Sequence, residues 1–155
     1  MQRLTWVLAE TNFAIPLQIR SYLEGATARD SIQLKSSRMY SAQLLDHFQN
    51  PRNAGDLPGA DATVEKENPV CGDVIRLSLK IQSERIHEIR FKAKGCVPSM
   101  ACGSALTELA LGKTIAEARN LSPAQVTEAV GGLPPASNHA AELAIEALLA
   151  VLKKL

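Results

Sequence analysis

The stretch that decides the fold is VIRLSLKIQSERIHEIRFKAKGC, at residues 74–96. Apolar and polar side chains alternate over 74–81 and again over 86–93, as in strands with one buried and one polar face. Strict alternation puts Ile86 on the same side as Glu88. The few residues between the two runs are enough for a tight turn. The pattern predicts an antiparallel hairpin.

A third strand and several helices are expected around this hairpin. Residues 62–66 alternate and predict a first strand. After Cys96 the apolar spacing changes to three and four residues, which predicts a helix that ends near Gly112. The other predicted helices begin after Lys113-Thr114, after Ser122-Pro123, near Asn138, and at Ser41, the last of these stopping before Asn50-Pro51. The expected fold class is α+β: a three-stranded antiparallel sheet with helices packed on one face, and an N-terminal helix before the sheet.

Charge and composition argue against several classes of function. The 155 residues include 17 basic and 16 acidic side chains, which are interspersed, so there is no basic stripe for nucleic acid. No run approaches the roughly 20 apolar residues that cross a bilayer. We therefore expect a cytoplasmic protein with no nucleic-acid or membrane partner. The three cysteines then suit metal or thiol chemistry better than a disulfide framework.

Residues 1–38 differ from the rest of the chain. They mix isolated apolar residues with both basic and acidic ones, and acidic residues are unusual in organellar transit peptides. We expect an extension that is poorly ordered or not native to the domain, with a short accessory helix as the alternative. Residues 39–155 are expected to form one domain.

Soft or titratable side chains stand where the regular pattern is interrupted. Cys71 and Asp73 precede a strand, Cys96 lies between the last strand and a helix, and His139 leads into the last helix. Thiolate, imidazole and carboxylate groups together can bind zinc, or iron joined by sulfide. The hairpin would bring Cys71 and Cys96 to the same end of the sheet. The pattern favours a metal site.

Each of these residues also has a plainer interpretation. Cys96 precedes a helix N-terminus, where we expect a lowered thiol pKa, but it could instead be a buried strand-end cysteine. Asp73 could be a turn residue, and His139 a surface histidine in a first helical turn. Cys102 shares the apolar face of Leu106 and is expected in the core.

Two of the three histidines lie outside the candidate ligands. His47 and His87 have no partners in the sequence and are expected at the surface or in packing.

A cysteine-nucleophile enzyme would use Cys96, His139 and Asp73 as nucleophile, base and orienting group. The sequence shows neither the cleft nor the oxyanion hole that such an enzyme needs, so this alternative is weak.

A series of short motifs resembles one known family. The specific blocks are Asn50-Pro51-Arg52-Asn53-Ala54-Gly55 and Cys71-Gly72-Asp73, taken together. Further matching blocks, in chain order, are Met39-Tyr40-Ser41, Asp46-His47-Phe48-Gln49, Arg90 to Cys96 with Ser99, Leu106-Thr107-Glu108 with Gly112-Lys113, and Leu133-Pro134-Pro135 with His139. Over nearly all of residues 39–155 the chain resembles the IscU/NifU N-terminal-domain family of iron-sulfur cluster assembly scaffold proteins.

The resemblance implies a carrier protein rather than an enzyme. Such a protein binds iron, accepts sulfur from a cysteine desulfurase, assembles a [2Fe-2S] cluster and passes it to iron-sulfur acceptor proteins. The resemblance implies Cys71, Cys96 and His139 as cluster ligands, and Asp73 as a carboxylate that tunes lability or binds the metal. It also implies an Hsp70-type chaperone that contacts Leu133-Pro134-Pro135.

The sequence departs from the family pattern in two places. Ala140 stands where family members carry a third cysteine, and alanine can neither bind a metal nor accept a persulfide. Ala136 and Ser137 replace the valine and lysine of the chaperone motif. Three interpretations of the first departure remain: a scaffold in which Asp73 or His139 takes the vacant role, a scaffold that uses Cys102, or a diverged relative that binds zinc or regulates the desulfurase without building clusters.

Overall fold

A computed structural model describes residues 39–155, so the expected extension over residues 1–38 lies outside the described residues. Three strands form one antiparallel sheet in the order β1-β2-β3. They are β1 (Ala62–Glu67), β2 (Val74–Gln82) and β3 (Arg85–Lys94). The predicted sheet is confirmed, and each strand is slightly longer than its alternating pattern.

The hairpin between β2 and β3 contains a bulge that the sequence pattern does not reveal. Its turn residues, Ser83 and Glu84, have positive φ values of 52° and 62°, as in the type I′ turn that suits a two-residue hairpin. Further along, Glu88 and Ile86 pair with successive residues of β2. His87 is therefore an extra residue, and the bulge returns Ile86 to the core face. For this reason the strict alternation that grouped Ile86 with Glu88 is wrong.

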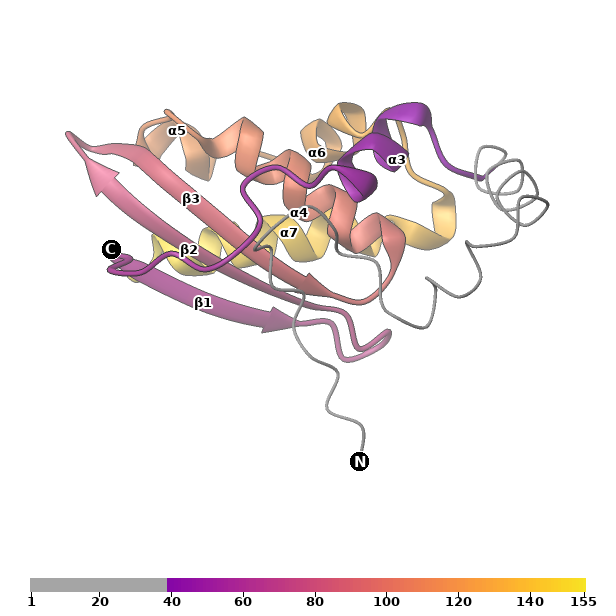
Figure 1. The fold of residues 1–155 in the computed structure, drawn as a ribbon, viewed down its shortest axis with the longest axis horizontal. Coiled ribbons are helices and arrows are strands. Elements are labelled where there is room, and N and C mark those ends of the chain that lie inside the picture. Colours follow the sequence, from indigo (N-terminus) through magenta and orange to yellow (C-terminus); the bar gives the residue numbers. More distant parts are fainter. Residues whose placement is uncertain (1–38) are drawn as a thin grey trace.

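The apolar face of the sheet carries the helices. Ile75, Leu77 and Leu79 of β2 are buried, as are Ile89 and Phe91 of β3. Figure 1 shows the helices gathered on one side of the sheet. The two that pack most closely on the strands are α4 (Val97–Ala110) and α7 (His139–Leu152). The predicted arrangement, with helices on one face, is confirmed.

The remaining helices pack around α4 and α7. Thr114 and Glu117 form a capping box at the start of α5, and Pro123 opens α6 at a position where its missing N–H is tolerated. None of the helices within residues 39–155 is long and apolar enough to cross a membrane. The elements are α3 (Ala42–Gln49), α5 (Ile115–Arg119), α6 (Pro123–Ala129) and a short 3-10 helix, η1 (Pro135–Ser137).

Helix α4 approaches the sheet closely at Gly103. A Cβ atom at this position would lie 2.7 Å from Phe91 Cδ2 and 3.2 Å from Ile75 Cδ1. Such distances are too short for a side chain in a close-packed interior. The missing side chain lets the middle of α4 lie against Ile75 of β2 and Phe91 of β3.

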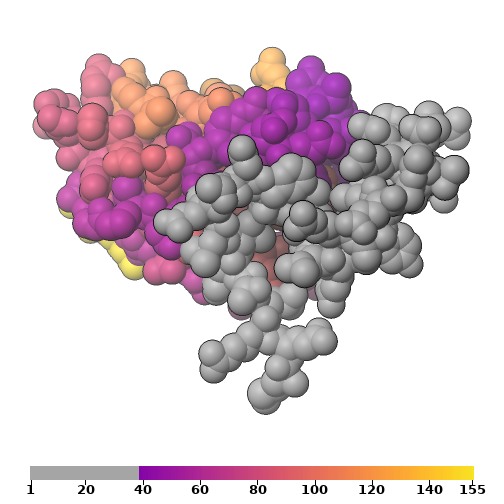
Figure 2. Space-filling model, in the orientation of Figure 1, coloured from indigo at the N-terminus to yellow at the C-terminus, as the bar shows by residue number. Residues whose placement is uncertain are grey.

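The segment that follows α3 is anchored on α4. Arg52 N–H donates to Ser104 Oγ (2.8 Å), and Asn53 Nδ2 donates to Thr107 Oγ1 (3.1 Å). In Figure 2 the indigo and purple residues of α3 and this segment form a continuous surface along the upper edge. His47 is buried, and its Nδ1 lies 2.9 Å from Ser104 Oγ. Of the two roles expected for His47, packing is the one that the structure supports.

The same segment also covers an edge of the sheet. Ala54 forms a parallel bridge with Phe91, and Gly55 N–H donates to the Phe91 carbonyl (2.9 Å). An open strand edge would leave backbone groups unpaired, and this pairing protects β3. The most distinctive motif of the sequence, residues 50–55, therefore builds the fold rather than the site.

Candidate metal centre

All four candidate ligands lie at one end of the sheet. The first residue of β2 pairs with the last residue of β3, so the residues just before β2 stand beside those just after β3. This pairing makes Asp73 and Cys96 neighbours, with Cys71 one short turn away. His139 is the first residue of α7, which packs on β1 and β2. The expectation that the two cysteines share one end of the sheet is confirmed.

A tight turn before β2 presents Cys71. Gly72 N–H donates to the Asn68 carbonyl (2.8 Å), and Val70 N–H donates to Asn68 Oδ1 (2.9 Å). Asn68 thus closes the turn with both its backbone and its side chain. Cys71 is left exposed, whereas Asp73, two residues later, is only 3% exposed.

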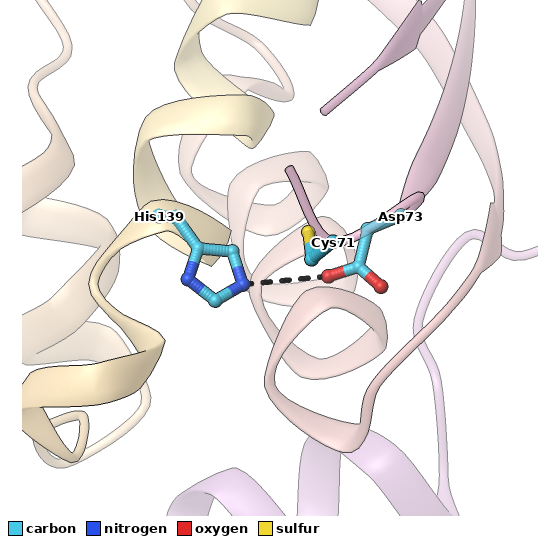
Figure 3. A group of neighbouring side chains, drawn as sticks. All are labelled: Cys71, Asp73 and His139. Carbon is cyan, nitrogen blue, oxygen red and sulfur yellow. Dashed lines mark ion pairs between the residues drawn. The ribbon is translucent and has the colours of Figure 1, made fainter. Parts of the chain in front are cut away.

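Three of the candidate ligands form one compact group. Cys71, Asp73 and His139 each offer a donor atom, and these atoms lie within 4.8 Å of one another. Figure 3 shows the three side chains converging, with the His139 ring pointing from the start of α7 toward the Asp73 carboxylate. His139 Nε2 lies 3.5 Å from Asp73 Oδ2. Together the three offer one sulfur, one nitrogen and one oxygen donor.

The imidazole of His139 is not satisfied by the protein. Its Nε2 is buried and lacks a hydrogen-bond partner, and among residues 39–155 it is the single buried side-chain nitrogen or oxygen in that position. Buried polar atoms are almost always paired, and an exception calls for an explanation. A nitrogen that points at a carboxylate and a thiol is suited to bind a metal ion.

Cys96 joins the site through Asp73. Its Sγ lies 3.2 Å from Asp73 Oδ2, and its backbone N–H donates to Asp73 Oδ1 (3.1 Å). Ser99 donates from Oγ to Asp73 Oδ2 at 2.6 Å. Cys96 lies outside the compact group of three, but it contacts the same carboxylate that faces His139. Asp73 is therefore the central residue of the site.

The hydrogen bonds around Asp73 keep it ionised. Burial by itself would raise its pKa, but hydrogen bonds from Ser99, Cys96 and Cys71 outweigh burial and hold the pKa below its usual value. A buried carboxylate that accepts several hydrogen bonds carries its negative charge at neutral pH. It can then attract a cation.

The expected lowering of the Cys96 pKa is wrong. Burial raises the pKa of the Cys96 thiol, and the Asp73 carboxylate adds to this rise, against hydrogen bonds from Ser99. The start of α4 is the location expected to favour the thiolate, but desolvation and a neighbouring negative charge exceed that effect. A bound cation would act in the opposite sense, because coordination stabilises a thiolate.

Gly95 makes room for the central carboxylate. Its φ is +146°, and a Cβ atom built there would lie 2.0 Å from Asp73 Oδ1. A side chain at position 95 would therefore occupy the place of the Asp73 carboxylate. Glycine at position 95 therefore suits both the positive φ and the close approach of Asp73.

Cys102 lies in the hydrophobic core rather than among the candidate ligands. Cys102 is fully buried in the hydrophobic core, as predicted, and burial raises the pKa of its thiol to about 12. Ala140, which stands where the family pattern has a cysteine, is 1% exposed and belongs to the same core. The Cys102 thiol is therefore not among the donor atoms that converge at this site.

Two residues of the site have no role that the sequence assigns. Gly95 stands out only as part of a motif, and Ser99 only as a residue that matches the family. A serine three positions after Cys96 in a helix lies above the helix start on the same face, because residues three apart are neighbours on a helix. That spacing is the available signal for Ser99. The contact between Gly95 and Asp73 crosses two strands and has no local signal.

Comparisons with known proteins agree with this architecture. Residues 39–155 match the family described as the NifU-like N terminal domain. The iron-sulfur cluster assembly scaffold protein IscU 1 of Archaeoglobus fulgidus is 46% identical over 110 residues, which cover 71% of this chain and 72% of the relative. The IscU scaffold protein of Aquifex aeolicus is 40% identical over 116 residues, 74% of each chain.

A solved structure shares the fold. The N-terminal part of a nitrogen-fixing NifU-like protein from Brucella abortus superposes with a TM-score of 0.59 at 17% identity, over 74% of this chain and 92% of that chain. At this identity the likeness concerns the fold alone. The family match over residues 39–155 and the two scaffold relatives lead to one conclusion: the chain belongs to the NifU-like N-terminal domain family.

Proposed function

We propose that this chain is a scaffold for iron-sulfur cluster assembly, which binds iron and sulfide as cargo and passes the cluster to acceptor proteins. The names of its relatives support this function. The observation that carries it is the buried, unpartnered Nε2 of His139, which faces Asp73 and Cys71. A buried imidazole nitrogen that faces a carboxylate and a thiol supports a role in holding a cation.

The proposed ligands are Cys71, Cys96, His139 and Asp73. Thiolate sulfur suits iron joined by sulfide, and imidazole replaces thiolate in some two-iron clusters. With two thiolates available, the other positions fall to nitrogen and oxygen, which bind iron-sulfide clusters less firmly. We propose a [2Fe-2S] cluster as the cargo, held in a labile state that favours transfer.

The proposed partners follow from this function. The sulfur is supplied by a cysteine desulfurase, and acceptor proteins receive the cluster. An Hsp70-type chaperone would contact the loop at Leu133-Pro134-Pro135, in which Leu133 packs on the core and Pro135 is exposed. Ala136 and Ser137 replace the valine and lysine expected in that loop, so we propose a weaker chaperone contact than in relatives that keep them.

A second candidate function rests on Ala140. Two thiolates, one imidazole and one carboxylate also make a four-ligand set for Zn²⁺. A chain that binds zinc and regulates a desulfurase would need no third cysteine. The two candidates differ in one measurable component, because only a cluster contains acid-labile sulfide.

The test is anaerobic reconstitution of the full chain with Fe²⁺ and sulfide. We expect visible absorbance and acid-labile sulfide in the wild-type protein, and loss of both in Cys71→Ala and Cys96→Ala. Cys102→Ala is the matched control, since it removes a thiol that lies in the core, and it should keep the cluster. Zinc without sulfide would favour the second candidate, and a cluster that depends on Cys102 would contradict the proposed ligands.

A further inference from the structure

Ser99 lies between two of the proposed ligands. It belongs to the first turn of α4, is 3% exposed, and has its Oγ 2.6 Å from Asp73 Oδ2 and 3.2 Å from Cys96 Sγ. A serine hydroxyl carries one proton, so it can donate to one of these two atoms at a time. The short distance to Asp73 indicates that the carboxylate is the present acceptor.

The oxygen that accepts from Ser99 is also the one that faces the other ligands. Asp73 Oδ2 is 3.5 Å from His139 Nε2 and 3.2 Å from Cys96 Sγ, whereas Oδ1 is held by the Cys96 backbone N–H. A metal ion bound among these residues would therefore approach Oδ2. Its arrival would compete with the Ser99 proton for that oxygen.

When a metal ion binds, the Cys96 sulfur becomes an acceptor for the Ser99 hydroxyl. Binding to a metal ion displaces the Cys96 thiol proton to solvent and leaves a thiolate, which no longer donates a hydrogen bond to Asp73 and instead accepts hydrogen bonds. Cys96 itself is half-buried. The Ser99 hydroxyl is 3.2 Å away and needs only to rotate to donate to it.

We propose that Ser99 is a positioning residue. Its hydroxyl donates a hydrogen bond to Asp73 before metal binding, and it rotates to donate to the Cys96 thiolate when Asp73 Oδ2 binds the metal. This proposal rests on the ligand set of the proposed function and adds a group that binds no metal itself. Hydrogen bonds from such outer groups orient ligands and tune metal–sulfur bonds.

The chain offers a matched control on the same helix. Ser104 is also buried in α4, but its Oγ contacts His47 Nδ1 (2.9 Å) and the Arg52 N–H (2.8 Å), away from the ligands. Replacing either serine by alanine removes a buried hydroxyl. Only the Ser99 substitution removes one that touches the site.

The experiment measures binding of Zn²⁺ and Co²⁺ to the full chain. Zn²⁺ affinity is obtained by chelator competition, and the thiolate-to-Co²⁺ charge-transfer band reports the hydrogen bonding of the bound sulfur. We expect Ser99→Ala to weaken Zn²⁺ binding by about 10-fold or more, as for loss of an outer-shell partner, and to move the band to lower energy. Ser104→Ala should change neither.

A pair of matched variants keeps the test valid if Ser99→Ala is poorly folded. Ser99→Thr retains the hydroxyl, and Ser99→Val has the shape of threonine without the hydroxyl. The Thr variant should therefore resemble the wild type, and the Val variant should resemble Ser99→Ala. Equal affinity and equal band position in the Thr and Val variants would overturn the role of Ser99. Wild-type protein that binds neither metal, or binding that survives Cys96→Ala, would overturn the ligand set as well.

Discussion

Two polar clusters that include residues of helix α4 share several residue types but differ in how their histidines are paired. The motif cluster consists of His47, Arg52, Ser104 and Glu108, and the cysteine cluster of Cys71, Asp73, Cys96, Ser99 and His139. Each contains a histidine, a buried serine and a carboxylate. In the motif cluster His47 Nδ1 is paired with Ser104, and Nε2 lies 3.7 Å from Glu108. In the cysteine cluster the buried His139 Nε2 has no hydrogen-bond partner, although it lies 3.5 Å from Asp73 Oδ2, so the two histidines differ in the hydrogen bond that joins His47 to Ser104.

This difference separates structure from function. In the motif cluster the hydrogen bonds of Ser104 pair groups that would otherwise be buried alone, and they stabilise the fold. An unsaturated cluster with soft donors is ready to accept a ligand. Both clusters lie in motifs that mark the family, so the motifs alone do not distinguish them.

The largest expected effect is at Gly95. In Gly95→Ala the new Cβ would lie 2.0 Å from Asp73 Oδ1, so the carboxylate must leave its place. We expect Zn²⁺ affinity, measured by chelator competition, to fall by at least about 10-fold. Gly55→Ala is the control, because Gly55 also has a positive φ of +126°, but a Cβ atom there would meet nothing within 4 Å. A similar loss of affinity in both variants would show that backbone strain, rather than the carboxylate, is responsible.

The next prediction concerns the residue at which this chain departs from its family. Ala140→Cys adds a thiol on the first turn of α7, beside His139, and should supply a third thiolate to a reconstituted cluster. We expect the cluster absorbance to decay several-fold more slowly under a fixed chelator challenge. Ala140 is 1% exposed, so the added sulfur also risks overpacking, and circular dichroism must show that the variant is folded. Equal decay rates would mean that the chain has compensated for the missing cysteine elsewhere.

Replacing the buried serine of the motif cluster should affect stability alone. Ser104→Ala leaves His47 Nδ1 and the Arg52 N–H without their partner. We expect a loss of about 1–3 kcal/mol in the free energy of unfolding, the usual result of stranding buried polar groups, measured by urea denaturation. Zn²⁺ affinity should stay at the wild-type value. A large loss of affinity would show that the two clusters are coupled through α4.

The smallest expected effect is a pH dependence that originates at His47. Burial lowers the pKa of His47, and the nearby Arg52 charge lowers it further, so the unfolded chain takes up a proton at a higher pH than the folded chain. The contribution to stability is full above the unfolded pKa of about 6.5 and is lost as pH falls below it. We expect the free energy of unfolding to decrease more on acidification in the wild type than in His47→Gln. Parallel pH profiles would contradict the assignment.

How much of this could be predicted from the sequence differs between the two clusters. The alternating runs predict the hairpin, and the hairpin predicts that Cys71 and Cys96 share one end of the sheet. Residue type singles out Asp73 and His139, and the resemblance adds their roles. The bulge at His87 escapes prediction because an inserted residue leaves the local composition unchanged.

The remaining gaps come from tertiary contacts. The raised pKa of Cys96 depends on burial and on Asp73 across the hairpin, and a local rule about helix termini does not include either. His47 has no partner within its own segment because Ser104 is 57 positions away in the sequence. Periodicity and spacing describe neighbours along the chain, whereas these effects arise between elements that only the fold brings together.

The most direct test compares the two histidines. Wild-type protein, His139→Ala and His47→Ala are reconstituted anaerobically with iron and sulfide, and bound iron and acid-labile sulfide are measured per folded chain. We predict that His139→Ala loses most of both, because it removes the unsatisfied donor of the cysteine cluster. His47→Ala should be less stable and should keep wild-type amounts in its folded fraction. Retention of iron and sulfide by His139→Ala, or an equal loss in His47→Ala, would contradict the claim that the unsaturated cluster holds the cargo.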